Sequence, residues 1–437
     1  MDIVILTICL FASLLVVFAL GLPPAFGLGG VAMVYALVLW GSESLMVATS
    51  AAMGTMMNFV LLAVPLFVFM GSIFSNSGIA DRLYATMYLW MGPLRGGLAM
   101  ATVAVGTIMA AMVGLVSPGI ITLGLIALPA MRKRGYQREL ACGSIMAAGG
   151  LGTLIPPSVS MMLYAMVTRQ SLGRLFMGGI IPGFVLSALY MTYIGIKSYF
   201  QPEIAPALPP EERATWIQRF VALKGALLPM MIIVAVMGSI FFGIATPTEA
   251  GAVGVLATLL TTAIYRRLNW PIMKDALYRT MSLTGMAIWI TIGASLFNRI
   301  FITLGGAELI TGGVLAADIS PWLILIGMQI SLILMGMITD DFAIVLIAAP
   351  IYSPIITALG FDPLWFAILF MINMQIAVLS PPFGFALFYM KGTVPPDITI
   401  VTLYRAVVPF ILLQILGLAL VMIFPALALT LPRLMYQ

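Results

Sequence analysis

The chain has 437 residues, of which 62% are hydrophobic and only 8% are charged, and its formal net charge is +5. A composition this apolar excludes an ordinary soluble protein and indicates a polytopic membrane protein. Histidine is absent, which excludes a histidine-ligated metal site, an imidazole base and a Ser-His triad. The two cysteines, Cys9 and Cys142, lie in apolar segments and are interpreted as core residues.

Apolar runs separated by polar loops predict ten membrane spans. The N-terminal run lacks the basic region of a signal peptide and is interpreted as a retained span. The longest polar break, residues 197–224, contains four prolines and is interpreted as a linker between two halves. The predicted spans are residues 3–21, 25–40, 57–76, 139–166, 175–197, 226–244, 249–265, 281–303, 363–390 and 406–430.

Two further apolar runs, at about 98–131 and 321–356, are predicted to be re-entrant hairpins. Each is longer than the ~20 residues that one span needs, and each is interrupted by small or polar residues. If the first run enters the membrane and returns, Arg95 lies on the same side as the basic cluster at 132–134. The positive-inside rule then puts most Lys and Arg residues in the cytoplasm and both termini in the periplasm.

The two halves of the chain carry the same landmarks in the same order. Ile155-Pro156-Pro157 in the first half corresponds to Ser380-Pro381-Pro382 in the second, and each interrupts a long apolar run. Broken helices occur in membranes only where they are buried in protein or line a cavity, and paired breaks indicate a transporter's binding site. The alternative is a chance similarity between apolar stretches rich in glycine and proline.

Each half is predicted to contain an odd number of crossings, so the second half is expected to be inverted relative to the first. The predicted fold is therefore an all-α polytopic membrane protein, an inverted-topology repeat with two re-entrant hairpins and two broken helices. The expected division is residues 1–200 for the first repeat, with its broken helix at about 139–166, 201–225 for the linker, and 226–437 for the second repeat, with its broken helix at about 363–390.

Asp340 and Asp341 are the most informative charges, because they lie in the second hairpin between apolar runs. A carboxylate at membrane depth costs ~2.5 kcal/mol or more on insertion scales, so such residues usually face a cation, a partner or a water-filled cavity. With Thr339 and unwound backbone carbonyls, they offer the oxygen ligands that a hard cation such as sodium prefers. The alternative is that an aspartate, Asp341 above all, only caps the helix that follows.

The first hairpin tip has Ser117 at the corresponding place, opposite the break at Gly152-Thr153. Serine oxygen and tip carbonyls suit a second cation there. The alternative is that the serine bonds its own helix backbone, as serines in membrane helices often do. By symmetry, Ser380 and Asn373 are expected to face the second tip.

Half-helix N-termini after each break carry partial positive charge and unpaired N–H groups. The helices that begin near Ser158 and Phe383 are expected to point these ends at the protein centre, where they suit an anionic substrate such as a carboxylate. Together with Gly152 and Asn373 they form the predicted substrate site. Arg299 has two interpretations, as a bidentate partner for the anion or as a side chain that snorkels to the outer interface.

Six motifs together suggest a family. They are Val64-Pro65-Leu66-Phe67, Leu128-Pro129-Ala130-Met131, Gly152-Thr153-Leu154-Ile155-Pro156-Pro157-Ser158, Thr246-Pro247-Thr248-Glu249-Ala250, Thr339-Asp340-Asp341 and Leu379-Ser380-Pro381-Pro382-Phe383-Gly384. On these motifs the chain resembles, nearly end to end, the large membrane subunit of the tripartite ATP-independent periplasmic (TRAP) transporters.

The resemblance implies sodium-driven uptake of an organic anion, a carboxylate or sugar acid, across a bacterial inner membrane. It also implies a periplasmic binding protein that delivers the substrate, a four-helix small membrane subunit, and an elevator motion of hairpins and broken helices. No cofactor is expected beyond sodium as the coupling ion. No small-subunit segment is fused to either end, so a separate small subunit is expected.

By the pattern of that family, the sodium ligands would be side chains at the hairpin tips and breaks, with nearby carbonyls. Carried over to this chain, they are Ser117, Thr153, Thr339, Asp340 and Ser380. The first tip reads Gly-Leu-Val-Ser-Pro-Gly, where many family members carry several small hydroxyl residues. The ligand set of the first sodium site therefore stays open.

Three other functions remain as alternatives. The first is a self-sufficient sodium/anion symporter of similar architecture. The second is an intramembrane enzyme, but the chain lacks histidine, and a catalytic dyad normally draws its two aspartates from different segments. The third is a channel, but inverted halves with breaks at the midplane favour alternating access over a fixed pore.

Overall fold

The computed structural model describes residues 3–316 and 319–435, and these residues form helices and connecting loops without a strand. Within them, eight helical segments are long and apolar enough to cross a membrane by length and composition. The all-α polytopic fold predicted from the sequence is confirmed. Three of the ten predicted spans do not qualify, because the first helix (Ile3–Ala19) has 17 residues and the two broken helices are divided into shorter halves. One segment that does qualify, Asp341–Ala358, belongs to the second predicted hairpin.

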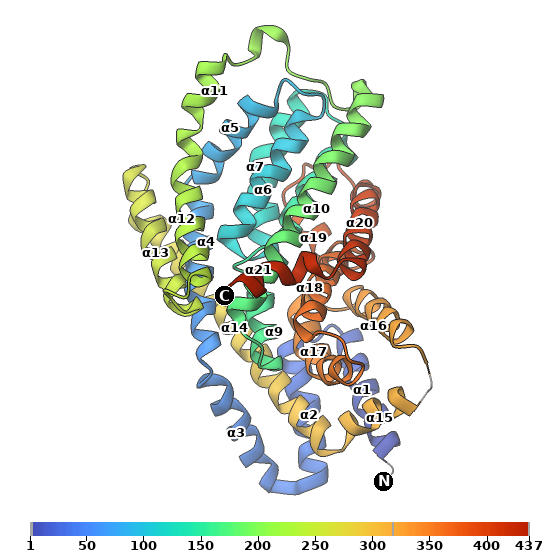
Figure 1. Cartoon of the computed structure of the whole chain (residues 1–437). Coiled ribbons are helices and arrows are strands. Elements are labelled where there is room, and N and C mark those ends of the chain that lie inside the picture. Colours follow the sequence, from blue (N-terminus) through green and yellow to red (C-terminus); the bar gives the residue numbers. More distant parts are fainter. Residues whose placement is uncertain (1–2, 317–318, 436–437) are drawn as a thin grey trace.

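One group of helices, here called the frame, comes from the start of each half (Figure 1). Within it α14 packs against α2, α3 and α4, and α13 packs against α4 and α12. A Cβ on Gly293 of α14 would lie 2.8 Å from the Ala25 carbonyl oxygen, so the small residue permits the close approach of α2. The frame comprises α1 (Ile3–Ala19), α2 (Pro24–Trp40), α3 (Ser44–Met56), α4 (Phe59–Asn76), α5 (Ile79–Met91), α11 (Trp216–Ala222), α12 (Lys224–Phe241), α13 (Pro247–Ile264), α14 (Trp270–Thr303) and α15 (Gly306–Ala316).

The second group, here called the hairpin group, holds both hairpins and both broken helices. In the first half these are the hairpin α6 (Gly97–Val113) and α7 (Val116–Lys133), the broken helix α8 (Arg138–Gly150) and α9 (Val159–Thr168), and then α10 (Leu172–Phe200). In the second half they are the hairpin α16 (Pro321–Gly336) and α17 (Asp341–Ala358), the broken helix α18 (Pro363–Leu379) and α19 (Phe385–Lys391), and then α20 (Ile400–Ile423) and α21 (Ala426–Leu434).

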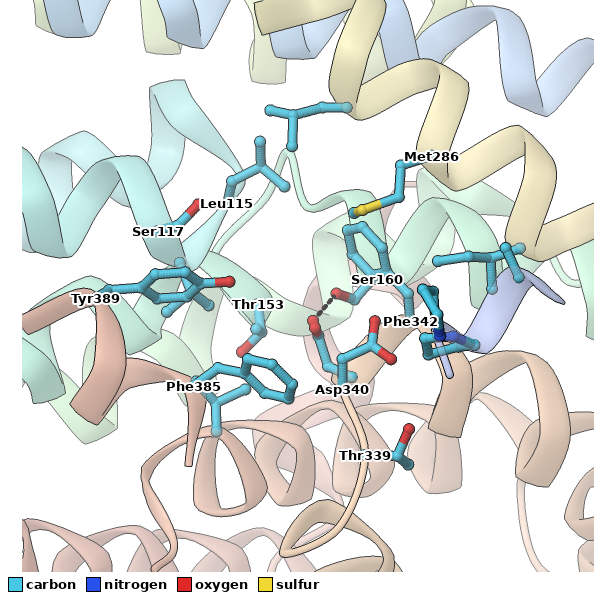
Figure 2. Close-up of a pocket in the computed structure, with 18 of the residues that line it drawn as sticks. Leu115, Ser117, Thr153, Ser160, Met286, Thr339, Asp340, Phe342, Phe385 and Tyr389 are labelled. Carbon is cyan, nitrogen blue, oxygen red and sulfur yellow. Dashed lines mark hydrogen bonds between the residues drawn. The ribbon is translucent and has the colours of Figure 1, made fainter. Parts of the chain in front are cut away.

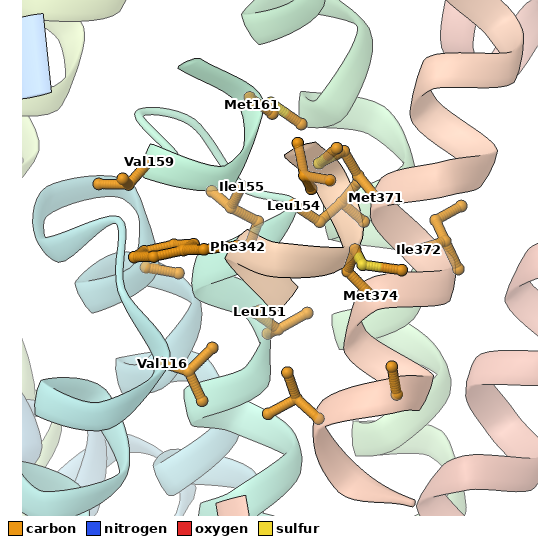
Figure 3. Close-up of a cluster of buried hydrophobic side chains, with 14 of the residues drawn as sticks. Val116, Leu151, Leu154, Ile155, Val159, Met161, Phe342, Met371, Ile372 and Met374 are labelled. Atoms are coloured by element: carbon orange, nitrogen blue, oxygen red, sulfur yellow. The ribbon is translucent and has the colours of Figure 1, made fainter. Parts of the chain in front are cut away.

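The halves interlock within the hairpin group. Helix α17 of the second half packs against α9 of the first, and α7 of the first half packs against α19 of the second. Figure 3 shows the apolar cluster at this junction, where Leu151 and Leu154 of the first break meet Met371 and Met374 of α18. All four side chains are fully buried, so the first break lies against packed protein rather than lipid.

Glycines let the first hairpin tip approach the first break and let the second hairpin approach α18. Gly114 has a φ of 65°, and its carbonyl accepts a hydrogen bond from the Val159 N–H at 3.2 Å. A Cβ at Gly114 would overlap the carbonyl oxygen of Pro157. In the second half, a Cβ at Gly336 would overlap the side chain of Ala377 on α18. Backbone groups freed by the broken helices are thus partly satisfied by the tips.

Loops rich in basic residues gather at one end of the molecule. Arg132 and Arg138 contact the same Asp397 oxygen at 3.1 and 3.3 Å. Arg134 pairs with Glu212 of the linker, and this hydrogen-bonded guanidinium lowers the pKa of the Glu212 carboxyl. These contacts join loops of both halves with the linker, which is the arrangement that the charge-based topology requires.

Several helices lie where the sequence predicted loops or different bounds. Residues 44–56 form α3, in which the hydroxyls of Thr49 and Thr55 donate to the carbonyls of Leu45 and Ala51. Helix α14 begins at Trp270 rather than at residue 281, and the predicted span 406–430 is divided between α20 and α21. Helices α5, α11 and α15 were not predicted.

Replacing Gly114 with alanine is expected to destabilise the protein strongly. The left-handed backbone alone costs an L-residue about 1–2 kcal/mol, and the overlap with Pro157 adds to that cost. The matched control is Gly135→Ala, since Gly135 has a φ of 74° and its added Cβ meets nothing within 4 Å. Thermal unfolding of the purified protein should show a much larger loss of Tm for Gly114→Ala than for Gly135→Ala. Equal losses would contradict the close contact between Gly114 and Pro157.

Candidate functional site

A cavity of about 410 Å³ lies where both hairpin tips, both broken helices and the frame meet (Figure 2). The hairpin group contributes residues 114–117 and 338–342, together with side chains from both broken helices. The frame contributes residues 21–25 and three apolar side chains of α14, of which Met286 is one. The volume lies in the range of about 300–1,000 Å³ that is usual for small-molecule sites.

Asp340 lines the cavity, and its carboxylate is not fully hydrogen-bonded by the surrounding protein. It precedes α17 in an extended conformation, and its side chain makes no capping hydrogen bond. Its Oδ1 atom is buried and has no hydrogen-bond partner among the described residues. A buried carboxylate oxygen is costly unless a hydrogen bond or a cation compensates it. The geometry therefore suits a cation beside Asp340.

Asp341 is held by a residue of the opposite half. The hydroxyl of Ser160, in the first turn of α9, donates to Asp341 Oδ2 at 2.7 Å (Figure 2). This bond crosses from the first broken helix to the second hairpin, so it ties the two halves together at the cavity. Hydrogen bonds to charged groups are typically worth about 1.5–3 kcal/mol.

The first tip supplies hydroxyl oxygens to the same cavity. Ser117 lines it from the first turn of α7, and Thr153 lines it from the first break. The Thr153 hydroxyl donates to the Gly150 carbonyl at 3.1 Å, which leaves its oxygen lone pairs for another partner. The structure thus brings four of the five predicted sodium ligands, Ser117, Thr153, Thr339 and Asp340, to one cavity.

The fifth ligand, Ser380, and two predicted substrate residues have contacts elsewhere. Ser380 is buried and donates to the Ile376 carbonyl at 2.7 Å. Asn373 is fully buried, and its amide donates to the Gln329 backbone oxygen at 2.8 Å and side-chain oxygen at 2.9 Å. Ser158 caps α9 and donates to the Thr153 carbonyl at 2.8 Å. None of the three is among the residues that line the cavity.

The other predicted substrate residues also lie outside the lining. Gly152 is buried under the first tip, where a Cβ would lie 2.9 Å from the Leu115 carbonyl oxygen. Phe383 is 55% exposed in the second break. Arg299 is exposed on α14 and donates to the Ser50 hydroxyl at 3.2 Å, which fits the interfacial interpretation. No Lys or Arg is found among the described residues that line the cavity.

Sequence reasoning missed Ser160, Phe385 and Tyr389. Figure 2 shows the Tyr389 ring directed into the cavity across from Ser117. A signal existed for all three, because Ser160 follows the first Pro-Pro break closely and the two aromatics follow the second. No such signal marks Met286, because α14 carries no motif that identifies which of its faces meets the hairpins.

The chain matches known transporters over most of its length. The family model described as "Tripartite ATP-independent periplasmic transporter, DctM component" matches residues 11–427. The chain is 33% identical over 379 residues to the C4-dicarboxylate TRAP transporter large permease protein DctM of Pseudomonas aeruginosa, covering 86% of this chain and 87% of that protein. It is 31% identical over 417 residues to the sialic acid TRAP transporter large permease protein SiaM of Vibrio cholerae, covering 95% of each.

A solved structure shares the fold at low sequence identity. The crystal structure of the Alcanivorax borkumensis YdaH transporter aligns with a TM-score of 0.64 at 15% identity, covering 96% of this chain and 98% of that one. At this identity the likeness shows the fold alone.

A double-mutant cycle between Ser160→Ala and Asp341→Ala is expected to show coupling of about 1 kcal/mol or more, because each change removes the same cross-half hydrogen bond. The matched control is Ser144→Ala, since Ser144 is also buried but donates only to the nearby Ala141 carbonyl. Its effect should add to that of Asp341→Ala. The measurement is chemical unfolding in detergent, and additivity of the Ser160 and Asp341 effects would contradict the contact.

Proposed function

This chain belongs to the DctM family, the large permease subunits of tripartite ATP-independent periplasmic transporters, and we propose that it couples sodium to the uptake of an organic anion. Family membership puts it among multi-pass membrane transporter subunits rather than enzymes. The observation that carries the proposal is that Asp340 lines the central cavity and that its buried Oδ1 atom has no hydrogen-bond partner within the described part of the chain.

Sodium is the proposed cation for this site. The carboxylate of Asp340 and the hydroxyl of Thr339 supply hard oxygen ligands at the second tip, and Ser117 and Thr153 supply hydroxyl oxygens near the first. A sodium ion at each tip would offset the charge of the two aspartates. The ligands Ser117, Thr153, Thr339 and Asp340 form the proposed set, and Ser380 would have to reorient to join it.

The charge of the cavity explains why an anion and sodium would move together. Two carboxylates line the cavity, and no Lys or Arg is found among its described lining residues. An anion that enters without a cation would therefore be repelled. At an effective dielectric constant of about 20, two like charges 4 Å apart repel by about 4 kcal/mol, and a cation at the same distance reverses the sign. Bound sodium would therefore make the site receptive to the substrate.

A carboxylate is the proposed substrate class. The two curated relatives described above are named for C4-dicarboxylate and sialic acid, which are both organic acids. The N–H groups at the start of α7, which receive no side-chain capping bond from Leu115, carry partial positive charge beside the cavity and suit a carboxylate. The apolar wall from α14 and the loop before α2 would contact the rest of the substrate.

An elevator motion of the hairpin group against the frame is the proposed mechanism. The cavity lies between the two groups, so sliding one against the other would change which side of the membrane it opens to. Gly114 packs against Pro157 of the first break and Gly336 packs against Ala377 of α18, and these close contacts favour movement of the hairpin group as one body.

The remaining proposals concern location and partners. The end that carries Arg132, Arg134 and Arg138 would face the cytoplasm of a bacterium with the chain in its inner membrane, and both termini would then be periplasmic. A periplasmic binding protein would deliver the substrate, and a four-helix small membrane subunit would brace the frame.

Replacing Asp340 with asparagine is expected to abolish sodium-dependent uptake, because the neutral amide cannot offset a sodium ion. The test is uptake driven by a sodium gradient in proteoliposomes that contain the chain, its small subunit and candidate binding proteins. The control is Asp275→Asn, which removes a carboxylate from an exposed ion pair with Arg279 and should leave uptake near normal. Uptake by Asp340→Asn at the normal rate with normal sodium dependence would remove Asp340 from the coupling site.

A further inference from the structure

A second cavity, of about 690 Å³, lies between the frame and the hairpin group and shares no lining residue with the first. Helix α12 forms one wall from Leu223 to Phe241, and α6 and α10 form the other. Every lining residue is apolar except Thr107, whose hydroxyl is already bonded to Ser187 and to the Val103 carbonyl. We call this cavity the α12 groove.

The α12 groove runs almost the whole depth of the membrane. The distance from Leu223 to Phe241 along a helix is about 27 Å at 1.5 Å per residue, and a bilayer's hydrocarbon core is about 30 Å thick. The groove is open outward, since Val234 is 65% exposed and Phe184 is 58% exposed. Water would find no polar partners there, so hydrocarbon chains are the suitable filling.

One end of the groove carries positive charge. Arg219 lies one helical turn before Leu223, and Lys224 directly follows that residue and is exposed. The Arg219 backbone is fixed by a hydrogen bond from the Trp90 indole at 3.0 Å, and its guanidinium lies over the Trp216 ring at 4.9 Å. Its Nε atom is buried and has no hydrogen-bond partner among the described residues.

Glu212 is the acidic residue closest in sequence to Arg219, but its carboxylate is paired with Arg134 and does not neutralise this end of the groove. Glu212 lies with Glu211 in a short turn before α11. Arg219 lies one helical turn beyond the Leu223 end of the apolar groove, on the same helix face as Leu223, and Lys224 lies beside that end. Positive charge at one end of a long apolar groove matches a phospholipid with a negatively charged headgroup in both shape and charge.

We propose that the α12 groove binds an anionic phospholipid, with its phosphate on Arg219 and Lys224 and its acyl chains along α12. The wall of the groove consists of a frame helix on one side and hairpin-group helices on the other. If the hairpin group moves, which rests on the proposed function, flexible chains would keep this gap filled while the two walls slide. Lipid composition would then influence the rate of transport.

Gly238, near the Phe241 end of the groove, allows a sharp test. A Cβ at Gly238 would meet nothing within 4 Å, so Gly238→Leu fills the groove without displacing backbone. The headgroup end is tested separately by the double change Arg219→Gln with Lys224→Gln. Matched controls are Gly30→Leu, at an exposed glycine of α2 with similar open space, and Arg267→Gln with Lys274→Gln, two basic residues outside the groove.

Lipid retained by the purified protein is measured by mass spectrometry after reconstitution in mixed phosphatidylethanolamine and phosphatidylglycerol. We expect phosphatidylglycerol to be enriched on the order of tenfold over its share of the bilayer, which two basic contacts to an anionic headgroup can supply. Gly238→Leu and the Arg219/Lys224 variant should each lose most of this enrichment, while both controls keep it. Thermal unfolding verifies that each variant is folded.

Three results would overturn the proposal. They are equal retention of both lipids by the unmodified protein, equal loss in the control variants, and a cross-link from Gly238→Cys to a small-subunit helix instead of lipid. Retention requires no uptake, so failure of this test leaves the sodium-coupled function untouched. Conversely, if uptake proves to be independent of sodium, the protein is still expected to retain the lipid.

Discussion

Non-helical backbone within a membrane must be satisfied by protein, and the fit of hairpin tips into broken helices meets that constraint here. The Gly114 carbonyl accepts from the Val159 N–H at 3.2 Å, and the missing side chain at Gly114 leaves room for the Pro157 carbonyl. Without this contact, two unwound segments would lie unpaired in hydrocarbon, where each unsatisfied group costs several kcal/mol. The hydrogen bond from Ser160 to Asp341 then holds the second tip at the same place.

The cavity at this junction draws on both halves and both groups of helices. Ser160 of the first half holds Asp341 of the second, while Asp340 beside it keeps a buried oxygen without a partner. One carboxylate is thus fixed within the protein, and the other is left for a ligand. Under the proposed function, this division would give adjacent aspartates a structural role and a binding role in one site.

The sequence was informative where a residue contrasts with its surroundings. Asp340 stands out because a carboxylate in an apolar run needs compensation, and Ser117 was found through its match to that position in the other half. The role of Ser160 depends on which helices of opposite halves pack together, which local pattern does not encode. The sequence left two interpretations of Arg299 open, because periodicity alone does not tell which face of a mostly apolar helix a residue lies on. Helix α3 was missed because its sequence is rich in hydroxyl residues, and the structure shows that the Thr55 hydroxyl bonds a carbonyl of the same helix.

The central claim, that ligands from oppositely placed tips share one sodium-dependent chamber, is tested most directly by thiol accessibility. Leu115→Cys and Ile338→Cys, at lining positions of the first and second tips that are not proposed ligands, would be introduced singly after replacement of Cys9 and Cys142, and labelled with a membrane-impermeant reagent with and without sodium. The account predicts that sodium protects both positions over the same concentration range and that both react from the same side in a given state. Protection of only one position, or reaction of the two from opposite sides at once, would contradict it.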